Sequence, residues 1–153
     1  MDKGHPQVNG GRDMRKRNGV ILAVIGYIVF FFCMEGWGAN WKVIGEDVGG
    51  SIWEIDLTSI FLQPNNFVRV LVKQIHSRKS AIDWVKKYGE QYKDFSHSIN
   101  LEEYQCTENK RRILSFTQYS LGGEIIFLDN APGEWMSVPL NSIAGVILKE
   151  VCK

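Results

Sequence analysis

The chain has 153 residues, of which 44% are hydrophobic and 23% charged, and its formal net charge is +1. This length and composition predict a globular protein with one domain. The first 38 residues hold five basic and three acidic residues, which leaves residues 39–153 with a net charge of −1. A domain so close to neutrality, without a basic patch or motif, has no general attraction for a phosphate backbone, which excludes nucleic acid as a partner.

The N-terminal segment has the features of an export signal. Residues 19–33 form an uninterrupted apolar run, and a basic cluster, Arg15–Arg17, comes shortly before it. The run is shorter than the roughly 20 residues that a transmembrane helix needs, and its length suits the apolar core of a secretory signal peptide. Small residues fit a cleavage site after Gly38. We therefore expect a targeting segment at 1–38, a folded domain at 39–153, and export to the periplasm or the cell surface.

Other interpretations of this segment stay open. Apolar residues just beyond the run extend it towards spanning length, so residues 19–38 could also be an uncleaved anchor, which would be the only membrane contact of the protein. The turn-rich stretch before Met14 also leaves the true start open between Met1 and Met14. Lipidation of Cys33 is disfavoured, because the preceding residue is Phe32 rather than a small residue.

Segments whose apolar residues alternate with period two predict about six strands in the mature domain. In chain order these strands are residues 41–44, 53–57, 67–76, 98–107, 112–120 and 124–128. Turn residues separate them at 49–50, 64–66, 108–110 and 122–123, so the first two strands form a hairpin and the last three form a meander. In the second strand, Trp53, Ile55 and Leu57 are expected on one face, with Glu54 and Asp56 on the other.

Two segments have helical spacing. The first begins after the third strand, with Ser80 as its N-cap, Asp83 completing a capping box, and Trp84, Tyr88 and Tyr92 on one face. These aromatic residues either pack on the sheet or form an exposed binding face.

The second helical segment is at the C-terminus, with Asn141 as the expected N-cap. An apolar stripe runs along it and includes Cys152. The other residues of the stripe are Ile143, Ala144, Ile147, Leu148 and Val151.

Two cysteines remain if the signal is removed, Cys106 and Cys152. Export brings them into an oxidising compartment, and the apolar stripe points Cys152 towards the sheet, so we expect them to form a disulfide. The closed loop of roughly 46 residues would be worth about 4 kcal/mol. Two unpaired buried thiols are the alternative. A metal site is not expected, because His76 and His97 have no ligand spacing relative to the cysteines.

No catalytic motif is present, whether a nucleophile elbow, a phosphate-binding glycine loop or a paired-histidine helix. His76 is expected to be a surface or hydrogen-bonded residue. The neighbouring carboxylates Glu102 and Glu103 point to opposite faces of a strand, and we expect them to be solvated. We therefore expect no enzyme activity and no cofactor.

Several short motifs follow one another in a recognisable order. They are Trp53-Glu54-Ile55-Asp56-Leu57-Thr58-Ser59-Ile60, Phe67-Val68-Arg69-Val70, Cys106 followed by Arg112-Ile113-Leu114, Glu134-Trp135 to Val138-Pro139, Ser142-Ile143-Ala144 and Val151-Cys152-Lys153. With these motifs, residues 41–153 resemble the surface-adhesin protein E family of exported bacterial proteins. The resemblance implies an α+β fold, an antiparallel sheet of about six strands with a C-terminal helix tied to it by a disulfide. The helical spacing described above predicts, in addition, a short helix between the third and fourth strands.

The resemblance also implies an adhesin-like module that binds a protein, here of unknown identity. The alternative is a periplasmic structural or assembly component, anchored or soluble, without an adhesin role. The segment 77–97 is the candidate contact region because it is long and carries its own helix with mixed charge. The candidate binding residues there are Arg78, Lys79, Trp84, Lys86, Lys87 and Tyr88.

Overall fold

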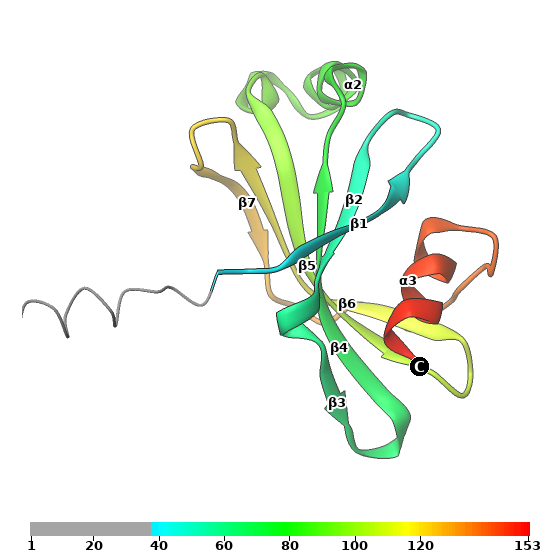
Figure 1. The fold of residues 1–153 in the computed structure, drawn as a ribbon. Coiled ribbons are helices and arrows are strands. Elements are labelled where there is room, and N and C mark those ends of the chain that lie inside the picture. Colours follow the sequence, from blue (N-terminus) through cyan, green and yellow to red (C-terminus); the bar gives the residue numbers. More distant parts are fainter. Residues whose placement is uncertain (1–37) are drawn as a thin grey trace, which may run out of the picture. The chain divides into compact units, whose positions relative to one another are not determined.

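The structure is a computed structural model that describes residues 38–153 (Figure 1). The segment expected to direct export lies outside the described residues except for Gly38, so export, cleavage and the 1–38 boundary stay predictions. Within the described part, no helix combines the length and the apolar character needed to cross a membrane.

Residues 38–153 form an α+β fold (Figure 1), in which the described elements are a single antiparallel sheet of eight strands and two α-helices. The strands are β1 (Trp41–Glu46), β2 (Ile52–Asp56), β3 (Phe61–Gln63), β4 (Phe67–Ile75), β5 (Phe95–Gln105), β6 (Lys110–Ser120), β7 (Ile125–Asp129) and β8 (Met136–Ser137). The helices are α2 (Arg78–Tyr88) and α3 (Ile143–Val151), with 3₁₀ turns η1 (Leu57–Ser59), η2 (Pro64–Asn66) and η3 (Glu90–Tyr92). The strand order is β1-β2-β4-β5-β6-β7, while β3 pairs with β4 and β8 pairs with β6.

The six predicted strands are confirmed, and α2 lies where the short helix was expected, between β4 and β5. The two additional strands, β3 and β8, have only three and two residues. Strands this short do not repeat an alternating pattern often enough to be recognised in a sequence.

The second strand ends earlier than predicted. Leu57 is not in β2 but begins the η1 turn, where its side chain is exposed. Asp56 is buried rather than solvated. Its carboxylate accepts hydrogen bonds from the backbone N–H of Asn40 and from the N–H and hydroxyl of Thr58. The aspartate of the motif at 53–60 is therefore the cap of a turn.

Both predicted N-caps were wrong, because the residue that caps each helix lies near the expected one in the sequence. Ser77 caps α2, because its hydroxyl accepts from the N–H of Ser80, the residue expected to be the cap. Ser142 caps α3 through the N–H of Gly145, in place of Asn141. Serine and asparagine are nearly equal as N-caps, so neighbouring candidates cannot be ranked by residue type.

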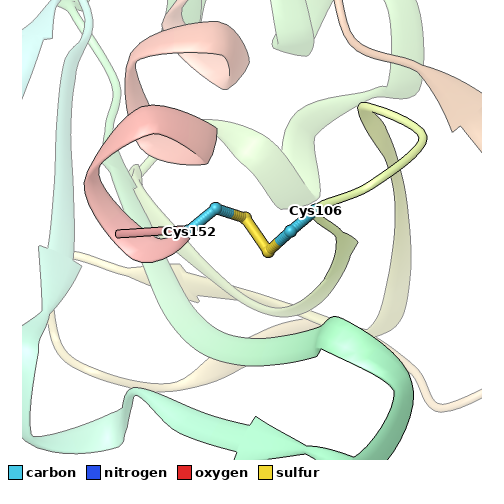
Figure 2. Close-up of a disulfide and its surroundings, with 2 residues drawn as sticks. All are labelled: Cys106 and Cys152. Atoms are coloured by element: carbon cyan, nitrogen blue, oxygen red, sulfur yellow. A yellow bond between two sulfur atoms is a disulfide. The ribbon is translucent and has the colours of Figure 1, made fainter.

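The main core lies between α3 and one face of the sheet. Val68, Val70 and Val72 of β4 are buried there together with Ile55 of β2 and Ile147 of α3. The predicted disulfide is present between Cys106, directly after β5, and Cys152, at the end of α3, with their Cα atoms 5.6 Å apart (Figure 2). It joins the C-terminal end of the helix to the sheet that the helix covers.

Candidate functional site

The structure divides the six candidate binding residues of α2 into two groups. Arg78, Lys79, Lys86 and Lys87 are exposed on the helix. Their only ion pair in the described part of the chain joins Lys86 to Asp83 at 3.8 Å, and both side chains are largely in solvent. Such a pair contributes little to stability, so these charges are available to solvent or to a partner.

The other two candidates, Trp84 and Tyr88, belong to an aromatic cluster. The Trp84 ring lies 4.7 Å from that of Tyr88, 5.3 Å from Tyr92 and 5.1 Å from Phe95, between ring centroids. Tyr92 and Phe95 are buried, whereas Tyr88 is 43% exposed and lies beneath Lys87. The aromatic stripe therefore packs α2 on the sheet, and its outer edge borders a shallow hollow with Lys87 and Asp83.

His76 is part of the same cluster rather than a catalytic base. Its ring lies 4.1 Å from the ring of Phe95, and burial lowers its pKa to about 4. Its two ring nitrogens have only long contacts, 3.4 Å each, with the hydroxyls of Ser80 and Ser98. No carboxylate in the described part bonds to either ring nitrogen, so this arrangement is not that of a nucleophile, a base and an orienting acid.

Both helices cover the same face of the sheet. Val72 of β4 is in the core under α3, and Ser98 of β5 lies on that same face by strand alternation. Gln118 of β6 is opposite Ser98 and accepts a hydrogen bond from the hydroxyl of Tyr92, beside α2. The other face of the strands has no described helix on it, and we call it the helix-free face.

Charged residues gather at one place on the helix-free face. Arg69 of β4, Glu103 of β5 and Arg112 of β6 are directly opposite one another in neighbouring strands. The Arg69 Nε donates to Glu103 Oε1 and the Arg112 Nε donates to Glu103 Oε2, each over 2.8 Å. Burial alone would raise the pKa of Glu103, but these bonds lower it below its usual value. The carboxylate is therefore charged at neutral pH.

Aromatic rings adjoin this charge cluster. The Arg112 guanidinium carbon lies 4.6 Å from the ring centroid of Trp135, which suits a cation–π interaction, and the ring of Phe67 lies 5.6 Å from that of Trp135. A hollow of about 240 Å³ opens here, between the β3–β4 turn and the cluster. Its lining residues are Gln63, Pro64, Asn65, Phe67, Glu103 and Arg112. We call Arg69, Glu103, Arg112, Trp135 and Phe67 the arginine–tryptophan cluster.

The neighbouring carboxylate, Glu102, points to the helix-covered face and is fully buried. It accepts hydrogen bonds from the hydroxyl of Tyr104 over 2.7 Å and from Nη1 of Arg111 over 2.9 Å. Arg111 also lines a cavity of about 320 Å³ beside the first turn of α3, whose other walls are mostly apolar. The two glutamates do face opposite sides as predicted, but the expectation that they are solvated was wrong, because each is paired with arginine.

The histidines, cysteines and carboxylates of residues 38–153 form no metal site. No group of three or more histidine, cysteine, aspartate or glutamate side chains there could hold a metal ion. The carboxylates with lowered pKa values, such as Asp47 and Asp56, accept hydrogen bonds from backbone N–H groups in turns. The arrangement offers surfaces for binding.

The open edge of the sheet is a further surface. β7 ends the strand order, and its side chains are mostly exposed, including Ile125, Phe127 and Leu128. An edge strand with exposed apolar residues has unpaired backbone groups that another strand can join.

Comparisons with known proteins agree with this architecture. A family model described as surface-adhesin protein E matches residues 41–153. Two solved structures of protein E from Haemophilus influenzae are similar to the chain. A selenomethionine form has 12% identity and a TM-score of 0.52, and the match covers 76% of this chain and 88% of that one. Crystal form II has 10% identity and a TM-score of 0.52, with 76% and 90% covered. At these identities the structures show the shared fold alone. No curated protein matches the chain.

Proposed function

Because the chain belongs to the surface-adhesin protein E family, we propose that it is an exported cell-envelope protein whose domain, residues 39–153, binds another protein in an adhesin-like manner. The family and the fold point to a non-enzymatic protein. Binding to another molecule is what the family description implies, and the identity of that molecule is left to experiment.

The observation that carries this proposal is the arginine–tryptophan cluster on the helix-free face. Tryptophan and arginine are the residues that most often dominate the energy of protein–protein contacts. In this chain Trp135 and Arg112 lie against each other beside a hollow, and no described helix covers them. A surface of this composition on an otherwise ordinary sheet is typical of a binding module.

The export part of the proposal is tested in cells that produce the full chain. Intact cells and spheroplasts are treated with an external protease, and the domain is detected by blotting for its size and redox state. Cleavage in intact cells would support a surface location, and matrix and plasma proteins would then be screened as ligands. Cleavage in spheroplasts alone would place the domain in the periplasm and count against the adhesin role.

The second candidate function is a structural or assembly role in the periplasm, anchored or soluble. The exposed apolar side chains of the β7 edge, Ile125, Phe127 and Leu128, favour it, because strand addition at an edge is a common way to join envelope proteins. Crosslinking in whole cells from a photoreactive residue at Phe127, compared with one at Trp135, separates the two functions. A crosslinked envelope partner from position 127 alone supports assembly, while a host protein from position 135 alone supports adhesion.

A further inference from the structure

The geometry points to the arginine–tryptophan cluster as a docking site for an acidic peptide segment, in which a carboxylate side chain meets the arginines while a neighbouring apolar side chain packs on Trp135. This inference rests on the proposed protein-binding function and names the chemistry of the partner. It assigns a different contact region from α2, where the sequence placed the candidate residues.

The arginine–tryptophan cluster carries a net positive charge. Two guanidinium groups, of Arg69 and Arg112, share the single carboxylate of Glu103, so the cluster keeps one positive charge. Glu103 is 4% exposed in its side chain, whereas the arginines are 40% and 31% exposed. The negative charge is therefore shielded beneath the two positive ones. Glu134 is exposed nearby in sequence, but the described residues show no ion pair between it and either arginine.

The two arginines of the cluster have N–H donors that no other described residue uses. A guanidinium has five N–H donors, and these arginines use their Nε groups on Glu103. Within residues 38–153, both terminal amino groups of Arg69 and Nη1 of Arg112 have no hydrogen-bond partner. These donors belong to side chains that are 40% and 31% exposed. They can bind a carboxylate in the two-pronged geometry that guanidinium groups favour.

Trp135 supplies the apolar part of the site. Its ring lies against both Arg112 and Phe67, which hold it in place. A fixed aromatic ring beside a charged group can bury an apolar side chain at a small cost in conformational entropy. The hollow of about 240 Å³ next to it also has Gln63 and Asn65, two residues with side-chain amides, among its lining residues. Amides can bond the backbone of an extended peptide.

The test uses the full chain in detergent micelles and a fluorescein-labelled peptide in which glutamates and leucines are two positions apart, so that both lie on one face of the extended peptide. Fluorescence anisotropy should show binding that weakens as salt is added, because the arginines are partly exposed. Peptides with glutamine or lysine in place of every glutamate should bind at least about 10-fold more weakly, because a charge-assisted hydrogen bond is lost. Equal binding of all three peptides would overturn the inference.

Variants locate the site. Arg69→Gln and Trp135→Ala should each weaken binding of the glutamate peptide by about 10-fold. The matched controls Lys86→Gln and Lys87→Gln remove the same charge from α2 and should leave the affinity unchanged. Glu103→Gln should tighten binding several-fold, since it releases the donors of both arginines, whereas a merely structural role would only weaken binding. Unfolding temperatures of all variants show which of them remain folded.

Two results would overturn the inference while leaving the proposed function intact. One is loss of binding in the α2 controls with no change in the cluster variants. The other is binding of a sulfated heparin fragment without binding of the peptide, which would make a polysaccharide the partner of these arginines. Failure of the proposed function is a separate result, in which surface-displayed protein binds no host protein and forms no crosslink from either position.

Discussion

The backbone N–H of Leu71 donates a hydrogen bond to the hydroxyl oxygen of Ser59 over 2.8 Å. Leu71 lies in β4 at the point where its partner changes, since β2 pairs with residues 72–75 and β3 with residues 67–69. Between the two partners the N–H of Leu71 would lack an acceptor from a strand. The Ser59 hydroxyl supplies the acceptor and donates in turn to the carbonyl of Asp56 over 2.7 Å. Ser59, in the motif at 53–60, thus satisfies the backbone of β4 at the point where the pairing partner of this strand changes from β3 to β2.

Replacing Ser59 with alanine should destabilise the domain by about 1–2 kcal/mol, because it leaves a partly buried N–H unpaired and removes a second hydrogen bond. Urea denaturation measures the change in the free energy of unfolding. Thr107→Ala, at an exposed turn position, is the matched control and should stay within about 0.5 kcal/mol of the wild type. Equal stability of both variants would show that water replaces the serine hydroxyl.

Much of the sheet could be predicted from the sequence, because alternation shows strongly in long strands that bury one face. β4 is the clearest case, with Val68, Val70 and Val72 in the core and Arg69 and Leu71, which lie between them, on the other face. The change of partner at Leu71 could not be predicted. It depends on a three-residue strand, β3, and on one side-chain hydrogen bond, neither of which produces a periodic pattern.

The arginine–tryptophan cluster was missed because its residues come from three strands and a loop. Symmetry about the hairpin turn does not find it either. In a hairpin, residues equally far from the turn pair with each other, so the predicted turn at 108–110 would place Glu103 opposite Ser115, whereas its observed partner is Arg112. To place Arg69 beside Glu103, the register between β4 and β5 must also be known. These strands are separated by α2, and no local pattern determines their register.

Removal of the disulfide should lower stability by about 4 kcal/mol, since the crosslink closes a loop with a sequence separation of 46 residues. The variant Cys106→Ser/Cys152→Ser avoids leaving a free thiol, and thermal unfolding measures the effect. Amide hydrogen exchange should show the largest loss of protection in α3, whose end the bridge ties to the sheet. An unchanged melting temperature would count against a stabilising bridge, and wild type treated with reductant is the control.

The buried pair of Glu102 and Arg111 should be strongly coupled. Arg111→Met alone leaves a fully buried carboxylate without its ion-pair partner and should cost about 3–5 kcal/mol. The double variant Glu102→Leu/Arg111→Met removes both charges and should be more stable than Arg111→Met. A double-mutant cycle by urea denaturation gives the coupling energy, and the exposed pair Glu108 and Lys110 is the control, whose coupling should be much weaker because solvent screens it. Similar coupling in both pairs would refute the role of burial.

Acidification should destabilise the domain through His76. Burial lowers the pKa of this histidine from 6.5 to about 4, so the folded state binds its proton only at lower pH than the unfolded chain does. Its contribution to stability is therefore complete above about pH 6.5 and is lost as the pH falls towards 4. Because the ring is only partly buried, the full linkage energy of such a shift is reduced by solvent to about 1–2 kcal/mol. Urea midpoints measured between about pH 7 and pH 5 should fall in the wild type and fall less in His76→Phe.

His97→Gln is the matched control. Burial lowers the pKa of His97 as well, but this ring stacks on Tyr119, and its charge is a smaller cause of the lowered pKa of His76 than burial is. It should keep most of the pH dependence. The carboxylates with lowered pKa values, Asp47, Asp56 and Glu103, lose their contribution only below this window. If the urea midpoint of His76→Phe falls with pH as steeply as that of the wild type, another group causes the acid sensitivity.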